Sequence, residues 1–278
     1  MRGRPLRPLP FSCKNSQLVS DTPLLELRNV YKSFGSVQAL TDVDFEVRAG
    51  EVMALVGDNG AGKSTLIKCI AGIHGMDEGT MLFEGGEVAV HTPKDAGRLG
   101  IEVVYQDLAL CDNLDVVQNM YLGREAASAF RILREPPMEK RTRETLASLR
   151  VTTIKSIRQT VATLSGGQRQ SVAVARAVMW NSKLVILDEP TAALGVAQTE
   201  QVLALVNRLA EQGLSVVLIS HNLHDIFETA TRITVLRLGR NVGVYARAST
   251  TQQEVVHAIT AGQPTKVSGI PSTAPVPA

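Results

Sequence analysis

The stretch GDNGAGKST, Gly57 to Thr65, constrains the fold more than any other part of the sequence. It follows the apolar run EVMALV and leads into KSTLIKCIAG, which has the composition of a helix. A G-x-x-x-x-G-K-[ST] pattern between a strand and a helix is the context expected of a phosphate-binding loop. Glycines let successive N–H groups point at phosphate, and the following helix adds the positive end of its dipole. We therefore predict a nucleotide site here, with a chance glycine-rich turn as the alternative.

Two side chains of this loop have predicted roles. Lys63 can reach the β- and γ-phosphates as a point charge, and the Ser64 hydroxyl is placed to bind Mg²⁺. The predicted cofactor-binding residues of the loop are Gly57, Asp58, Asn59, Gly60, Ala61, Gly62, Lys63, Ser64 and Thr65.

Strand-like and helix-like segments alternate along the rest of the chain. This alternation favours an α/β fold with a mostly parallel sheet. Residues 107–163 show helical patches and no convincing strand, so we expect a helical insertion there. The expected strands are 24–30, 43–48, 51–56, 101–105, 183–188 and 215–220, and the expected helices start near 63, 115, 138, 165, 198 and 222.

Composition sets limits on function. The chain has 29 basic and 27 acidic residues among 278, a net charge of +2, which argues against an electrostatic nucleic-acid binder. No apolar run approaches the roughly 18 residues of a membrane-spanning helix, so a membrane role would need another chain. We expect disordered tails at 1–22 and 262–278, which are rich in Pro and Ser, around one domain at 23–261.

Adjacent carboxylates end the apolar run LVIL. Asp188 follows a strand that should finish beside the phosphates, where such an aspartate holds Mg²⁺. Glu189 is then free to orient or deprotonate an attacking water. The alternative for Glu189 is an ordinary acidic residue near a helix N-terminus.

The stretch LSGGQ, Leu164 to Gln168, is a second candidate phosphate site. Ser165 is a good N-cap, and the glycines after it expose backbone N–H groups at the start of a helix. By itself S-G-G is a common turn. The predicted ligand-contacting residues here are Ser165, Gly166, Gly167 and Gln168.

These motifs occur in an order that resembles the ATP-binding subunit of ABC transporters. SFG with Phe34 looks like the loop that stacks on adenine, VVYQD with Gln106 like the Q-loop, and LISHN with His221 like the switch histidine. The resemblance covers about residues 24–245. It implies a RecA-like P-loop core with a small antiparallel β subdomain and an inserted helical subdomain. Without the resemblance, Phe34 would more often be a core residue, and His221 would be a structural residue of the surface or the core.

A finer resemblance concerns Thr92 to Glu125, which is similar to monosaccharide importers, although lipid and amino-acid importers carry a related pattern. TAALG, Thr191 to Gly195, is also similar to that subclass. Most of the family has an aspartate where this chain has Gly195. Either a backbone contact suffices there, or coupling between two ATP sites is weaker.

The resemblance implies a mechanism in which two copies enclose two ATP molecules, each between one copy's phosphate loop and the other's LSGGQ. The implied cofactors are ATP and Mg²⁺, and the implied partners are membrane permease subunits, a second cassette and, indirectly, a sugar-binding protein. The place is the cytoplasmic face of the membrane. The predicted catalytic residues are Glu189, His221 and Gln106, and the predicted metal ligands are Ser64, Gln106 and Asp188.

Two other functions stay open at this stage. One is a soluble ATPase of the same type that acts as a mechanical switch on DNA or ribosomes. It would carry a long coiled-coil insertion or two cassettes, and neither is visible in the sequence. The other is a regulatory cassette that binds ATP without hydrolysing it.

Overall fold

The computed structural model describes residues 22–127 and 132–262. The sequence-based expectation of disordered tails falls almost wholly on 1–21 and 263–278, outside the described residues, and it stays a prediction.

A six-stranded sheet forms the centre of the molecule, in the order β10-β9-β3-β8-β7-β6. Neighbours from β9 to β6 pair in parallel, and β10 pairs antiparallel with β9. Every residue of β3 and β8 is buried, as expected of parallel strands covered on both faces. The strands are β3 (Val52–Val56), β6 (Ile101–Val104), β7 (Leu184–Asp188), β8 (Ser215–Ile219), β9 (Arg232–Arg237) and β10 (Arg240–Ala246).

A second, antiparallel sheet has the order β2-β1-β4-β5. The long hairpin of β1 and β2 turns at Gly35, whose φ of 59° suits glycine. The sequence located parts of β1 and β2 but not the two strands that complete the sheet. The bounds are β1 (Leu25–Phe34), β2 (Val37–Val47), β4 (Glu78–Phe83) and β5 (Gly86–Glu87).

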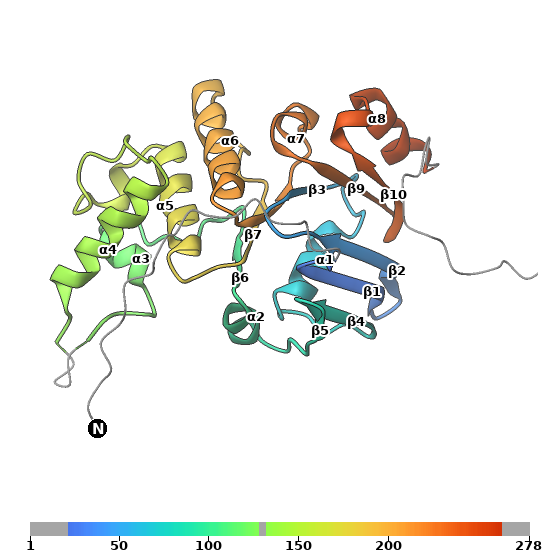
Figure 1. Ribbon diagram of the computed structural model, residues 1–278, viewed down its shortest axis with the longest axis horizontal. Coiled ribbons are helices and arrows are strands. Elements are labelled where there is room, and N and C mark those ends of the chain that lie inside the picture. The colour runs from blue at the N-terminus through green and yellow to red at the C-terminus, as the bar shows by residue number, and fades with distance from the viewer. Residues whose placement is uncertain (1–21, 128–131, 263–278) are drawn as a thin grey trace, which may run out of the picture.

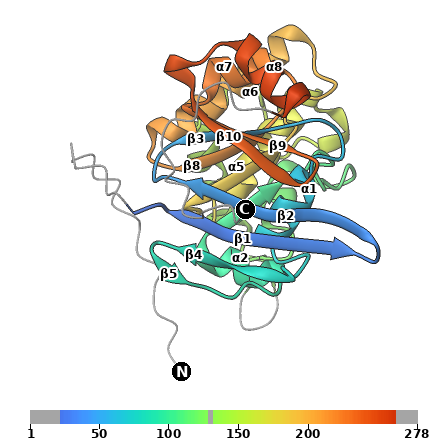
Figure 2. The same cartoon turned by 90° about the vertical axis from the view of Figure 1, so that its right-hand side faces the viewer.

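Helices cover both faces of the six-stranded sheet, and β3 shows how. Its Val52, Ala54 and Val56 belong to a core shared with α5, α6 and α8, while Met53 and Leu55 belong to a core shared with α1 and the antiparallel sheet. Figure 2 shows α7 and α8 on one side of the six-stranded sheet and β1, β2, β4 and β5 on the other. The helices are α1 (Lys63–Ile70), α2 (Pro93–Leu99), α5 (Gly166–Val178), α6 (Val196–Glu211), α7 (Leu223–Thr229) and α8 (Gln252–Ala261).

The described residues between β6 and α5 contain α3 (Val116–Tyr121), α4 (Glu135–Ser148) and the short 3₁₀ helix η1 (Val161–Thr163). This part lies at the end of the molecule away from the antiparallel sheet (Figure 1). Arg158 links the segments of this part, because the Arg158 guanidinium donates to Asp115 at the start of α3 and to Glu135 and Glu139 of α4. These three carboxylates raise the pKa of Arg158.

The α/β class expected from the sequence is confirmed by this topology. The expected helices and strands are present, with ends that differ by a few residues. No helix among residues 22–127 and 132–262 is long and apolar enough to cross a membrane.

Asn119 of α3 fixes the turn that precedes its own helix. Its side chain is fully buried, accepts from the Cys111 amide at 2.7 Å, and donates to the carbonyls of Cys111, Leu114 and Asp115 at 3.0–3.3 Å. These bonds pair backbone groups that the loop cannot pair by itself.

We expect Asn119→Ala to lower the free energy of unfolding by about 2–4 kcal/mol, because it leaves several buried backbone groups unpaired. Chemical denaturation measures the change. Asn113→Ala is the matched control, since Asn113 is exposed in the same segment and its loss should cost less than about 0.5 kcal/mol. Equal losses in the two variants would contradict this account.

Candidate functional site

The loop from Gly57 to Gly62 curls tightly over the end of β3. Gly57 has φ 152°, and a Cβ there would lie 2.2 Å from the carbonyl oxygen of Leu236. Gly62 has φ 100°, and its Cβ would meet the Ala39 carbonyl at 2.8 Å. Both positions require glycine because backbone from neighbouring strands fills the space of a side chain. The loop is therefore pressed against β2 and β9 while its outer side, Asp58 to Gly60, is exposed.

Lys63 is the first residue of α1, and it is buried. Its Nζ donates to the carbonyls of Gly57 at 2.6 Å and Asp58 at 3.0 Å, so the ammonium group sits in the curve of the loop. Burial lowers the pKa of Lys63, and the charges of Glu189, Asp188 and Asp58 oppose this shift. An anion such as phosphate would pair with a cation already taken out of water.

Asp188 and Glu189 stand at the C-terminal end of β7. Burial raises the pKa of Asp188, the adjacent Glu189 carboxylate raises it further, and Lys63 and Lys68 oppose the rise. Glu189 has φ 49°, and its amide donates to the Ile219 carbonyl at 2.9 Å. The chain thus leaves β7 through a left-handed conformation at Glu189.

His221 contacts Glu189 from the end of β8. Its Nδ1 lies 3.1 Å from Oε2 of Glu189, and its side chain is 69% exposed, so the ring is free to move. A hollow of about 410 Å³ lies between these groups and the phosphate loop. It is lined by Val56, Gly57, Asp58, Asn59, Glu189, Ser220, His221, Leu223 and Ile259.

Two oxygen-bearing side chains fit a hard cation: Ser64 follows Lys63 in α1, and the charge of Asp188 acts on Lys63. The Ser64 hydroxyl and the Asp188 carboxylate are oxygen ligands of the kind that Mg²⁺ takes together with phosphate and water oxygens. No group of three or more His, Cys, Asp or Glu gathers into a metal site within the described part of the chain. A magnesium ion here would therefore depend on phosphate oxygens for several of its ligands.

The LSGGQ segment lies elsewhere in the same chain. Ser165 caps α5 and accepts from the Gln168 amide, while the Gln168 side chain accepts from the Ser165 amide. A Cβ on Gly166 would meet Leu194 at 2.8 Å, and one on Gly167 would meet Gln198 at 3.2 Å. The segment packs on the start of α6 and contributes nothing to the lining of the hollow.

Gln106 and Phe34 also lie outside that lining. Gln106 is exposed in a bend just after β6. Phe34 ends β1, is 43% exposed, and has its ring 5.0 Å from that of His74 in an edge-to-face arrangement. Lys32 lies over the same ring at 5.3 Å.

Sequence reasoning missed two residues of this region. Tyr105 precedes Gln106, and burial followed by the charge of Asp188 raises its pKa. Asp225 of α7 is buried and accepts from the Thr191 hydroxyl at 2.6 Å. An aspartate four residues after a candidate switch histidine was the available signal, but an acid in the first turn of a helix is too common to single out.

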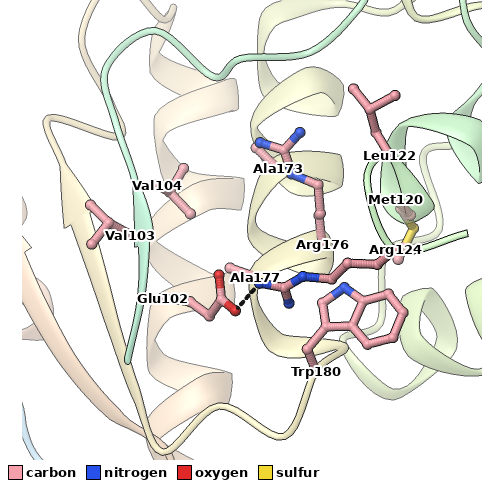
Figure 3. Close-up of a pocket in the computed structure, with 10 residues that line it drawn as sticks. All are labelled: Glu102, Val103, Val104, Met120, Leu122, Arg124, Ala173, Arg176, Ala177 and Trp180. Atoms are coloured by element: carbon pink, nitrogen blue, oxygen red, sulfur yellow. Dashed lines mark hydrogen bonds and ion pairs between the residues drawn. The ribbon is translucent and has the colours of Figure 1, made fainter. Parts of the chain in front are cut away.

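A second hollow, of about 210 Å³, separates β6 from α3 and α5. Figure 3 shows Arg124 between Glu102, which it contacts at 2.8 Å, and the ring of Trp180. Arg176 donates to the carbonyls of Leu108 and Ala109, and burial lowers its pKa. Two arginines and Glu102 line this hollow together with apolar side chains, and none of the residues predicted for ATP belongs to the lining.

Comparison with known families gives a match to the family described as ABC transporter over residues 40–192. The chain is 46% identical to the fructose import ATP-binding protein FrcA of Rhizobium meliloti, over 86% of this chain and 94% of that protein. It is also 46% identical to the xylose/arabinose import ATP-binding protein XylG of Sulfolobus acidocaldarius, over 85% of this chain and 94% of that protein. It spans only 46% of the ribose import ATP-binding protein RbsA of Yersinia pestis, with 39% identity.

Solved structures resemble the fold as well. The ADP conformation of MJ1267, an ATP-binding cassette of an ABC transporter, matches with a TM-score of 0.74 at 26% identity, over 86% of this chain and 95% of that one. The dimeric structure of MJ0796, a bacterial ABC transporter cassette, matches with a TM-score of 0.68 at 25% identity, over 80% and 98%.

The raised pKa of Asp188 predicts a pH-dependent effect of Asp188→Asn. A carboxyl whose pKa is higher in the folded chain binds protons more tightly there, so the free energy of unfolding falls as pH rises through that range. The asparagine variant lacks this loss. We expect its Tm, relative to that of the unsubstituted chain, to increase from about pH 4, the ordinary range of an aspartate, towards pH 7.

Thermal unfolding without nucleotide across a pH series measures the difference. A difference in Tm that stays constant or shrinks with rising pH would contradict the assigned environment of Asp188.

Proposed function

This chain belongs to the ABC transporter family, and on that premise we propose that it is the ATP-hydrolysing subunit of an importer for a simple sugar. Cassettes of this family bind nucleotide and are ATPases. The observation that carries the proposal is the meeting of Gly57, Glu189 and His221 around one hollow, with Lys63 and Asp188 beside it. Two relatives that match most of this chain are named as fructose and xylose/arabinose import proteins, which supports a simple sugar as the imported substrate.

In the proposed reaction, the backbone N–H groups of residues 57–65 and the Lys63 ammonium hold the β- and γ-phosphates of ATP. Ser64, Asp188 and Gln106 would hold Mg²⁺, which neutralises charge on the phosphate oxygens when bound. Catalysis then depends mostly on positioning and charge stabilisation, because phosphoryl transfer needs little covalent help from the protein. Phe34 stacks on adenine from the end of β1.

Glu189 takes the proton of the attacking water in this proposal, and His221 positions the γ-phosphate. Support comes from the 3.1 Å contact between them, which places both side chains at one edge of the hollow. The water oxygen attacks the γ-phosphorus, and the bond from that phosphorus to the ADP oxygen on the opposite side breaks. The proton of the water passes to the Glu189 carboxylate.

We propose that two copies complete the site. Ser165, Gly166, Gly167 and Gln168 lie outside the hollow of their own chain. Ser165 and Gly166 are exposed at the capped start of α5, while Gly167 is buried. In a head-to-tail dimer, Ser165 and Gly167 would contact the γ-phosphate bound by the other copy. The dimeric MJ0796 cassette, which this chain resembles, supports a paired arrangement. A heterodimer with a second cassette is the other possibility for the pair.

The proposed place of action is the cytoplasmic face of a membrane, bound to permease subunits that receive sugar from a binding protein. A switch acting on DNA or ribosomes is less consistent with the relatives, which are import proteins, and with the near-neutral charge. A cassette that only binds ATP is less consistent with the presence of both Glu189 and His221.

We place the permease contact at the hollow of Figure 3. It adjoins the segment after Gln106, and its rim carries Leu122, which is 45% exposed. Arg176 brings a partly desolvated positive charge that donates to two backbone carbonyls, and the charge of Glu102 acts on it. A permease segment with an acidic side chain beside apolar ones would match this surface.

The role of Glu189 predicts that Glu189→Gln binds ATP with unchanged affinity and hydrolyses it at least about 10²-fold more slowly. Phosphate release and equilibrium nucleotide binding measure the two quantities. Glu211→Gln is the control, because Glu211 is exposed at the far end of α6. Near-normal turnover of Glu189→Gln would overturn the assignment of the base.

The permease contact predicts that Leu122→Glu reduces co-purification with the permease, because it adds a buried negative charge to an interface. Val256→Glu is the control, since Val256 on α8 is equally exposed, at 45%. Retention of the permease by both variants, or loss by both, would contradict this location.

A further inference from the structure

Asp225 joins two loops that end at the candidate catalytic site. Its carboxylate accepts from the Thr191 hydroxyl at 2.6 Å through one oxygen and from the Asn222 side chain at 2.9 Å through the other. Thr191 follows Glu189 in the loop after β7, while Asn222 follows His221 in the loop after β8. One buried side chain therefore ties the base-bearing loop to the histidine-bearing loop.

Burial makes this connection firm. Asp225 is 1% exposed, whereas the other side-chain contact between the loops, His221 to Glu189, involves a histidine side chain that is 69% exposed. A hydrogen bond to a carboxylate out of water is stronger than one at the surface and costs more to lose. The exposed contact can open when a nucleotide arrives, and the buried one keeps the loops in register.

The loop from Glu189 to Gly195 needs such an anchor. Glu189 and Ala193 have positive φ values of 49° and 61°, which residues with a side chain seldom adopt. Gly195, which ends the loop, has nothing within 4 Å of where its Cβ would lie, and it is held through its backbone carbonyl, which accepts from the amides of Gln198 and Thr199. The amides of Ala192 and Leu194 donate within the loop, to Glu189 and Thr191. Thr191 bonds this turn to α7 through a buried carboxylate, in addition to the packing of Leu194 beside Gly166 of α5.

We propose that Asp225 is a positioning residue for ATP hydrolysis. It holds Thr191, and through Thr191 the backbone turn that aims Glu189 at the hollow, in fixed relation to His221. The inference rests on the proposed function, because the role is defined by hydrolysis, but its first test does not require turnover.

Three variants of the full chain distinguish the effect of losing the Thr191–Asp225 hydrogen bond from the effect of a general loss of stability. Thr191→Val removes the hydroxyl that donates to Asp225 while keeping the volume of the side chain nearly the same. Thr191→Ser keeps the hydroxyl. Thr229→Val is the matched control, because the Thr229 hydroxyl donates at 2.8 Å to the backbone carbonyl of Asp225 and leaves the carboxylate untouched.

Hydrogen exchange of the Ala192 and Leu194 amides is the first readout. We expect about tenfold faster exchange in Thr191→Val, exchange close to that of the unsubstituted chain in Thr191→Ser, and no change at these two amides in Thr229→Val, although that variant lowers Tm. Unchanged exchange in Thr191→Val, or equal acceleration in Thr229→Val, would overturn the anchoring role.

Steady-state ATP hydrolysis is the second readout. Thr191→Val should lose about tenfold in kcat with KM for ATP changed by less than about twofold, and Thr191→Ser should recover most of the loss. If Glu189→Gln inactivates the chain but Thr191→Val keeps full kcat, the positioning role of Asp225 is overturned and the proposed function stands. An unsubstituted chain that binds ATP without hydrolysing it would overturn the proposed function and, with it, the catalytic part of this inference.

Discussion

The positions of the candidate site residues depend on the register of the parallel strands β3, β8 and β7. Leu55 of β3 lies beside Ile219 of β8, and Ile219 lies beside Asp188 of β7. The three strands therefore end at one level, and the residues that follow them meet there. This brings the phosphate loop after β3, His221 after β8 and Glu189 after β7 to one edge, although more than 160 residues of chain separate the first from His221.

Burial at that edge shapes the electrostatics. Lys63 and Asp188 are each drawn out of water, so burial lowers the pKa of one and raises that of the other, while each opposes the shift of its partner. Burying these two charged groups destabilises the folded chain when no ligand is bound. Binding of phosphate and a divalent cation would stabilise it, because they supply opposite charges. The charge of Glu189 acts on both members of this pair, opposing the lowered pKa of Lys63 and adding to the raised pKa of Asp188.

The elements recognised in advance were those with a strong local signal. The glycine loop, the buried runs of β3, β7 and β8, and the amphipathic α6 follow from patterns of a few residues each. The strands β4 and β5, the helix α2 and the C-terminal elements β9, β10 and α8 did not, because short or edge elements have weak periodicity and depend on the sheet that they join. Among the residues of this region, Tyr105 carried no signal and Asp225 carried one too common to single it out, since the contacts that matter come from neighbours distant in sequence.

The sequence by itself was enough to propose the chemistry: a phosphate loop, an aspartate to hold a metal with a base beside it, a histidine after a strand, and a helix that starts with two glycines. Each of these proposals depends on residue types at fixed local spacing. The tertiary structure alone decided which of these groups share a hollow in one chain and which face away. The strand order β3-β8-β7 gathers Gly57, His221 and Glu189, while the packing of α5 against α6 holds Ser165 outside. The physical reason is that strand order and helix packing are set by burial across the whole core, which no local pattern encodes.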